Sequence, residues 1–156
     1  MGVIFSNIDL KAACYGHLED SFGTIRIQSD VFDFDHTRYY CDEMGDRLYR
    51  QFLCFDFRLK PELLYDVKLK TVDIEQKFLS DSGRQFNLDP GGLASHHYVL
   101  LSTKNYAHRL FLNQGIYGEL CYLFQRQKVT VLPWTYPEYQ RDEIRGLFGG
   151  FRSKFC

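Results

Sequence analysis

Hydrophobic positions recur along the first half of the chain with two spacings, one typical of strands and one typical of helices. The apolar run Val3–Phe5 predicts a first strand, and a helix is expected to follow it and to end at Gly23. Apolar side chains of that helix recur near helical spacing at Leu10, Cys14, Leu18 and Phe22. Further strands are predicted over residues 24–28, 31–35 and 48–57. A second helix is predicted from Pro61 to about Leu79, because proline suits the first helical turn.

The second half of the chain is dominated by alternation typical of strands. We expect strands over residues 84–88, 97–102, 107–112, 116–124 and 129–132, and a last helix over residues 138–155 that Gly149-Gly150 interrupts. This order predicts an α+β fold, a mainly antiparallel sheet with helices packed on one side. The opening elements can form a ferredoxin-like βαββαβ unit, followed by a β-meander and the C-terminal helix. No linker or repeat separates the halves, so one domain is expected over residues 1–156.

Composition narrows the class of protein. With 156 residues, 45% hydrophobic and 25% charged, the chain has the profile of a soluble globular domain. A net charge of -1 argues against nucleic acid as the main partner. No apolar stretch approaches transmembrane length or forms a signal peptide, so we expect no membrane span and a cytoplasmic location. The five cysteines are odd in number and contain no C-x-x-C pair, which favours reduced thiols over disulfides or zinc.

Charged side chains inside predicted strands are the main functional signal. A three-residue loop at Asn113-Gln114-Gly115 would place Arg109 opposite Glu119 and Phe111 opposite Tyr117 on one face, whereas a two-residue loop would separate Arg109 from Glu119. The pair is either an exposed ion pair or an arginine held so that its free donors face an anion. His108 is the candidate general acid or base, and a regular strand would direct it away from Arg109.

The second helix carries a charged stripe. Lys68 and Glu75 are seven residues apart and share this stripe with Thr71. The stripe is either a solvated helix face or one wall of a pocket between helix and sheet. In the pocket, Lys68 would converge with Lys104 and Arg109.

Three further segments carry candidate site residues. Asp89 opens a turn with Pro90-Gly91-Gly92 and could hold Mg²⁺ that bridges to phosphate. Asp33 and Asp35, on one face of a predicted strand, either form a solvated strand face or are the other candidate ligands, for Mg²⁺ or Ca²⁺. The sequence does not identify a cofactor beyond this suggestion of Mg²⁺. Leu132-Pro133-Trp134-Thr135-Tyr136-Pro137 is rigid and aromatic. It is either a packed lid over the core or a stacking wall for a ligand ring.

Several motifs in combination are similar to a known family. They are Phe32-Asp33-Phe34, Tyr39-Tyr40, Glu43-Met44-Gly45, Asn87-Leu88-Asp89-Pro90-Gly91, Ser102-Thr103-Lys104-Asn105-Tyr106-Ala107-His108-Arg109, Gly115-Ile116-Tyr117-Gly118-Glu119 and Leu132-Pro133-Trp134-Thr135-Tyr136-Pro137. Over essentially its whole length the chain resembles an uncharacterised bacterial family, the domain of unknown function four-four-one-six. The resemblance implies no established activity.

Two classes of function are therefore expected. The first is binding of a small anionic ligand, a phosphorylated metabolite or a nucleotide, with catalysis by His108 if the protein is an enzyme. The ligand-binding candidates are Lys68, Glu75, Asp89, Lys104, Arg109, Tyr117, Glu119, Trp134 and Tyr136. The second is a non-catalytic interaction module, in which exposed aromatic residues and the C-terminal amphipathic segment form a homodimer or partner interface. Convergence of the charged candidates in one concavity would favour the first class.

Overall fold

The computed structural model describes residues 1–35, 37–126 and 128–156, and it divides into two compact units. The first unit consists of Met1–Leu59 and Leu69–Asp89, and the second of Lys60–Lys68 and Pro90–Cys156. Each unit contains its own antiparallel sheet, which confirms the α+β class. That the whole chain forms one domain stays a prediction.

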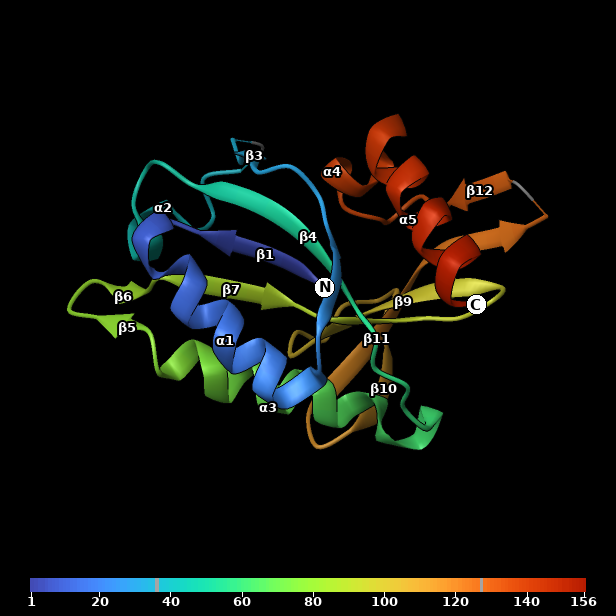
Figure 1. The fold of residues 1–156 in the computed structure, drawn as a ribbon, viewed down its shortest axis with the longest axis horizontal. Helices are drawn as coiled ribbons and strands as arrows, with labels where there is room; N and C mark the ends of the chain where they lie inside the picture. Colours follow the sequence, from blue (N-terminus) through green and yellow to red (C-terminus); the bar gives the residue numbers. More distant parts are fainter. Residues whose placement is uncertain (36, 127) are drawn as a thin grey trace. The chain divides into compact units, whose positions relative to one another are not determined.

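The sheet of the first unit has the predicted βαββαβ topology. Its strands are β1 (Gly2–Phe5), β2 (Ile25–Gln28), β3 (Phe32–Asp33), β4 (Tyr49–Phe55) and β7 (Phe86–Asp89). The order is β2-β4-β1-β7, with β3 also paired to β4, and every neighbouring pair is antiparallel (Figure 1). Because β4 lies between β1 and β2, the connection through the first helix is the split crossover of a ferredoxin-like unit.

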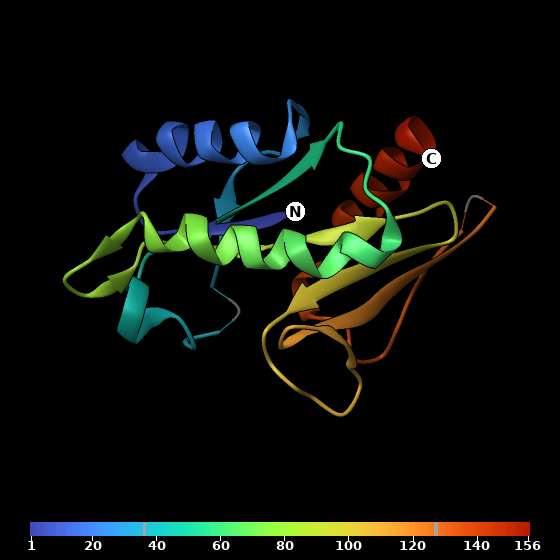
Figure 2. The same cartoon turned by 90° about the horizontal axis from the view of Figure 1, so that it is seen from below.

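Helices cover this sheet on two sides (Figure 2). Helix α1 (Lys11–Phe22) is ended by Gly23, whose φ of 74° suits glycine. Its His17 ring meets Phe78, which in turn packs on Phe86 in β7. On the opposite face Ile4 packs with a cluster beneath the short helix α2 (Cys41–Met44). The other members of that cluster are Phe34, Met44 and Leu48, with Tyr40 packed against them.

The second long helix is shorter than its sequence predicts. A 3-10 turn over Pro61–Leu63 leads into α3 (Leu64–Gln76), so proline does occupy the first turn. The helix ends before Leu79 because β5 (Leu79–Ser80) pairs with β6 (Gly83–Arg84) in a small hairpin. A glycine at position 83 with a φ of 130° lets the chain reverse there.

The second unit contains a sheet whose strands are β8 (Gly91–Leu93), β9 (His97–Ser102), β10 (Leu110–Asn113), β11 (Ile116–Gln125) and β12 (Lys128–Val131). The order is β10-β11-β9-β8, and β12 also pairs with β11. The sequence does not predict β8, because Gly91-Gly92 has the composition of a turn. Strand β10 begins at Leu110 rather than at Ala107, because residues 107–108 form a turn.

Aromatic rings fill the core between this sheet and its helices, α4 (Pro137–Gln140) and α5 (Asp142–Phe155). The Phe148 ring of α5 lies 4.6 Å from the Tyr98 ring and 5.1 Å from the Tyr122 ring. The Tyr122 hydroxyl donates to the carbonyl of Tyr139 at 2.6 Å. Helix α5 continues through Gly149-Gly150, because burial of its aromatic face offsets the low helix propensity of glycine. None of the helices formed by the described residues is long and apolar enough to cross a membrane.

Two glycines of the second unit should respond in opposite ways to alanine. A Cβ atom at Gly91 would overlap the buried Tyr98 ring, so Gly91→Ala should lower the free energy of unfolding by about 1–3 kcal/mol. Gly146, within α5, has open space where a Cβ would lie, so Gly146→Ala should raise it by up to about 1 kcal/mol. Urea denaturation followed by circular dichroism measures both changes. Equal changes in the two variants would contradict this packing.

Candidate functional site

The hairpin of β10 and β11 brings two predicted site residues together through an irregularity. Its turn has two residues, Gln114 and Gly115, with φ of 47° and 76° as a type I′ turn requires. Asn113, rather than Leu112, pairs with Ile116, and a bulge at Leu112 restores the pairing of Phe111 with Tyr117. The expectation that a two-residue loop separates Arg109 from Glu119 is therefore wrong, since the bulge compensates for the shorter turn.

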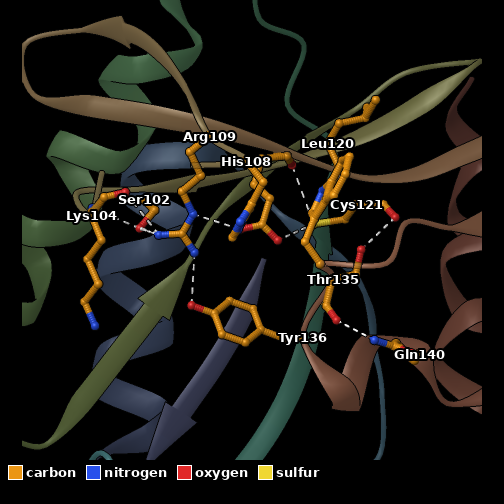
Figure 3. Close-up of polar contacts among 11 residues, drawn as sticks. Ser102, Lys104, His108, Arg109, Leu120, Cys121, Thr135, Tyr136 and Gln140 are labelled. Carbon is orange, nitrogen blue, oxygen red and sulfur yellow. Dashed lines mark hydrogen bonds and ion pairs between the residues drawn. The ribbon is translucent and has the colours of Figure 1, made fainter. Parts of the chain in front are cut away.

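Arg109 and Glu119 form a buried ion pair. The Nε atom of Arg109 lies 2.8 Å from Oε2 of Glu119, and each side chain is 1% exposed. The Nη1 atom donates to the Ser102 hydroxyl at 2.7 Å and to the Lys104 carbonyl at 3.2 Å, and Nη2 donates to the Tyr136 hydroxyl at 3.0 Å (Figure 3). Most of the five guanidinium donors are thus committed within the protein. The pair is neither an exposed ion pair nor an arginine open to an anion.

The environment of Arg109 keeps its guanidinium charged. Burial by itself lowers the pKa of Arg109, but hydrogen bonds to Glu119 and Tyr136 outweigh burial, so the pKa is raised above its ordinary value. Arg109 therefore serves to fix the carboxylate, the Ser102 hydroxyl and the Tyr136 phenol in one arrangement.

His108 joins the same carboxylate. Its Nε2 atom lies 3.1 Å from Oε2 of Glu119, and its side chain is 28% exposed. The imidazole stacks on the Trp134 indole, with ring centroids 5.9 Å apart and planes inclined by 15°. The expectation that His108 points away from Arg109 is wrong, because His108 lies in the turn before β10, where side chains do not alternate. Glu119 thus holds a buried guanidinium and a partly exposed imidazole at once.

A second bulge positions the aromatic loop of residues 132–137. The register of β11 against β9 shifts between Leu120 and Tyr122, and the two carbonyls at this point accept hydrogen bonds from the loop. Leu120 accepts from Nε1 of Trp134 at 2.9 Å, and Cys121 accepts from the Thr135 hydroxyl at 3.1 Å. The loop is anchored through the strand backbone, while the Trp134 ring stays exposed beside His108.

The remaining candidates of the second unit contribute differently. Lys104 supplies its carbonyl to Arg109, whereas its ammonium group points away from the guanidinium (Figure 3). Tyr117 pairs with Ser102 across the strands and packs edge-on against Phe111 at 5.7 Å. Lys68 is buried on α3, and its convergence with Lys104 and Arg109 stays a prediction.

Glu75 and Asp89 belong to a separate polar cluster in the first unit, centred on Arg84. The Arg84 guanidinium contacts Glu43 at 2.7 Å and 2.9 Å, and its Nη1 lies 3.2 Å from Oε2 of Glu75 and 3.2 Å from the Asn87 side-chain oxygen. The hydrogen bond to Glu43 is the main reason why the pKa of Arg84 is raised. Convergence of Asp89 and Glu75 with Arg109 in one concavity stays a prediction.

Asp89 lies at the other end of this cluster. Its Oδ1 accepts from the Asn87 amide at 2.9 Å, and its Oδ2 accepts from Nη1 of Arg50, a fully buried arginine, at 2.8 Å. Both oxygens are therefore engaged by the protein.

The other candidate metal ligands, Asp33 and Asp35, do not share a strand, because β3 ends at Asp33. In residues 1–35, 37–126 and 128–156, no group of three or more His, Cys, Asp or Glu side chains could hold a metal ion.

The charged stripe of α3 faces inward. Lys68, Thr71 and Glu75 are all buried, so the interpretation as a solvated helix face is wrong. The Oε1 atom of Glu75 accepts from the backbone N–H of Leu88 at 2.6 Å. Sequence reasoning missed Arg50 and Arg84 in the first-unit cluster, because neither lies in a recognisable spacing with its partners.

The buried thiols are not activated. Cys121 lies 3.6 Å from Oε1 of Glu119, and burial together with the Glu119 charge raises its pKa. Burial also raises the pKa of Cys14, to about 12. Both thiols are therefore protonated at neutral pH, and neither is a nucleophile there.

Removing one partner of the buried ion pair should lower the free energy of unfolding much more than removing one partner of an exposed ion pair. We expect Arg109→Ala to lower the free energy of unfolding by about 3–5 kcal/mol, because Glu119 would stay buried without its partner. Arg26→Ala is the matched control, since Arg26 and Asp56 pair at 3.1 Å with side chains 52% and 46% exposed. Arg26→Ala should lower the free energy of unfolding by at most about 1 kcal/mol. Similar urea midpoints for the two variants would show that the Arg109–Glu119 pair is not desolvated.

Native thiol titration provides an independent check. Cys156 is exposed and should react with a disulfide reagent within the mixing time. Cys14 and Cys121 should stay unreactive from pH 7 to pH 9, because their raised pKa values keep the thiolate form rare throughout that range. Mass spectrometry of the labelled peptides identifies the sites. Labelling of Cys121 in the folded protein as fast as that of Cys156 would contradict the buried environment.

Comparisons with known proteins assign the chain to a family. The family model described as Domain of unknown function (DUF4416) matches residues 1–155. Neither the curated proteins nor the solved structures include a significant match. The matched region covers every motif on which the resemblance rests. The chain therefore belongs to the family described as domain of unknown function DUF4416.

Proposed function

We propose that the second unit binds a small anionic ligand, a phosphorylated metabolite or a nucleotide, beside His108. One observation carries the proposal: a partly exposed imidazole is fixed by a buried ion pair and stacked on an exposed indole. A histidine that only fills space does not need a carboxylate and an arginine behind it. Such support is typical of side chains held ready for a ligand.

The local charge favours an anion. Arg109 neutralises Glu119 within the protein, so the carboxylate behind the imidazole does not leave an uncompensated negative charge at the site. Because Nε2 of His108 is directed to Glu119, Nδ1 is the nitrogen for a ligand to meet; none of the described residues hydrogen-bonds to it. An anion at Nδ1 would receive a charge-assisted hydrogen bond when the ring is protonated.

The aromatic surroundings favour a ligand that also has a flat ring. Trp134, Tyr136 and Tyr106 are all exposed, and the Tyr106 ring lies 6.0 Å from the imidazole. Exposed rings of this kind stack on a base or another aromatic group. This combination supports a nucleotide over a sugar phosphate. If the bound ligand is transformed, His108 is the general acid or base and Glu119 is its positioning residue.

An interaction module is the second candidate, and strand β10 favours it. Leu110, Phe111 and Leu112 are 76%, 62% and 39% exposed, and β10 lies at an edge of its sheet. An exposed apolar edge strand offers its backbone groups and side chains to another strand. The apolar face of α5, in contrast, is already buried within the unit.

The only tryptophan of the chain makes the ligand proposal directly testable. Trp134 fluorescence should change on titration with nucleotides and sugar phosphates, each with and without Mg²⁺. His108→Ala should weaken binding of the best ligand at least about tenfold, since a charge-assisted hydrogen bond is lost. His97→Ala is the matched control, because His97 is exposed on β9 of the same unit. The affinity of this variant for the best ligand should stay within about twofold of the wild-type affinity.

Two outcomes would overturn the ligand proposal. One is the absence of any fluorescence or thermal-midpoint change across the panel. The other is equal weakening by His108→Ala and His97→Ala. Concentration-dependent self-association that Phe111→Ser abolishes, measured by sedimentation, would then favour the interaction module.

A further inference from the structure

A basic groove lies on another part of the second unit. Helix α5 forms one wall and the β11–β12 hairpin forms the other, and the open groove between them has a volume of about 640 Å³. The helix presents Gly146 and Gly149 to the groove, and a Cβ at Gly149 would lie 3.5 Å from Val129. Small residues at this point leave space between helix and hairpin. The volume is within the range of about 300–1,000 Å³ that small-molecule sites occupy.

Cationic side chains dominate the groove. Arg126, Lys128, Arg145 and Arg152 line it, and Asp142 is the only carboxylate among the lining residues. Asp142 forms an ion pair with Arg145 one turn along α5, which leaves an excess of positive charge from both walls. The chain as a whole has a net charge of -1, so this excess is local. A concave surface of one sign concentrates ions of the opposite sign.

Arg152 is held in place before any ligand arrives. Its Nε donates to the Ser95 carbonyl at 2.8 Å, its Nη1 donates to the Arg126 carbonyl, and its guanidinium lies 5.6 Å from the Phe124 ring centroid. Within the described part of the chain, no residue accepts a hydrogen bond from Nη2. A guanidinium that is already fixed loses little side-chain entropy when it binds an anion.

We propose that this groove binds the phosphate groups of a soluble phosphorylated ligand that carries two or more phosphates. Arginine and lysine from both walls suit phosphate oxygens, and several cations together suit a multiply charged anion. The concave shape favours a small molecule over the flat surface of a membrane. The site is separate from the one proposed at His108, since neither His108 nor Trp134 lines the groove.

Inorganic pyrophosphate is the probe, and isothermal titration calorimetry is the measurement. The full chain should bind pyrophosphate, and Lys128→Gln should weaken binding about tenfold because one cation of the groove is lost. Lys154→Gln is the matched control, since Lys154 is exposed on α5 outside the groove, and it should change the affinity by less than about twofold. Binding at the groove should leave Trp134 fluorescence unchanged, since Trp134 does not line it.

Four results would overturn the proposal. They are the absence of pyrophosphate binding, equal weakening by Lys128→Gln and Lys154→Gln, binding that only His108→Ala weakens, and co-sedimentation with phosphatidylglycerol vesicles without pyrophosphate binding. The first two exclude a built phosphate site, and the third assigns the anion to His108. The fourth assigns the basic surface to a lipid headgroup. Failure at the groove leaves the nucleotide titration of Trp134 unaffected, so the two proposed sites are tested separately.

Discussion

The arrangement of the second unit around its candidate site depends on the burial of Arg109 and Glu119 against each other. Two charges removed from water are tolerated only if they are paired and if their other hydrogen-bonding atoms are satisfied. Ser102, the Lys104 carbonyl and Tyr136 meet that condition for the guanidinium, and each comes from a different segment. The ion pair therefore fixes a strand end, a turn and the aromatic loop to one another, and His108 is positioned as a consequence.

Irregular positions in the strands make this arrangement possible. The bulge at Leu112 returns Arg109 to the face of Glu119, and the bulge next to Leu120 turns backbone carbonyls toward the loop that carries Trp134. Regular strands would satisfy those carbonyls within the sheet and leave the loop without anchors. The functional candidates thus gather where the sheet departs from ideal pairing.

Much of the fold could be predicted from the sequence, whereas only part of the site could. Spacing and turn residues identified β9 at its bounds, the end of α1 at Gly23 and the split βαββαβ order. The pairing of Phe111 with Tyr117 was also foreseen, but for the wrong reason, because a bulge cannot be distinguished from a longer loop by composition. The position of His108 does not follow from strand alternation, because its segment forms a turn in which side chains do not alternate. The role of Arg84 was missed because its partners Glu43 and Glu75 lie 41 and 9 residues away along the chain.

Glu75 also has a structural effect beyond the Arg84 cluster. Strand β7 ends its sheet, and the Glu75 carboxylate accepts the outward N–H of Leu88 that a further strand would otherwise use. A helix side chain thus closes the sheet where a neighbouring chain could attach. Edge strands left open are sites of aggregation, and a covered edge removes that hazard. Loss of this carboxylate would remove the hydrogen bond that occupies the Leu88 N–H on the edge strand, as well as one partner of Arg84.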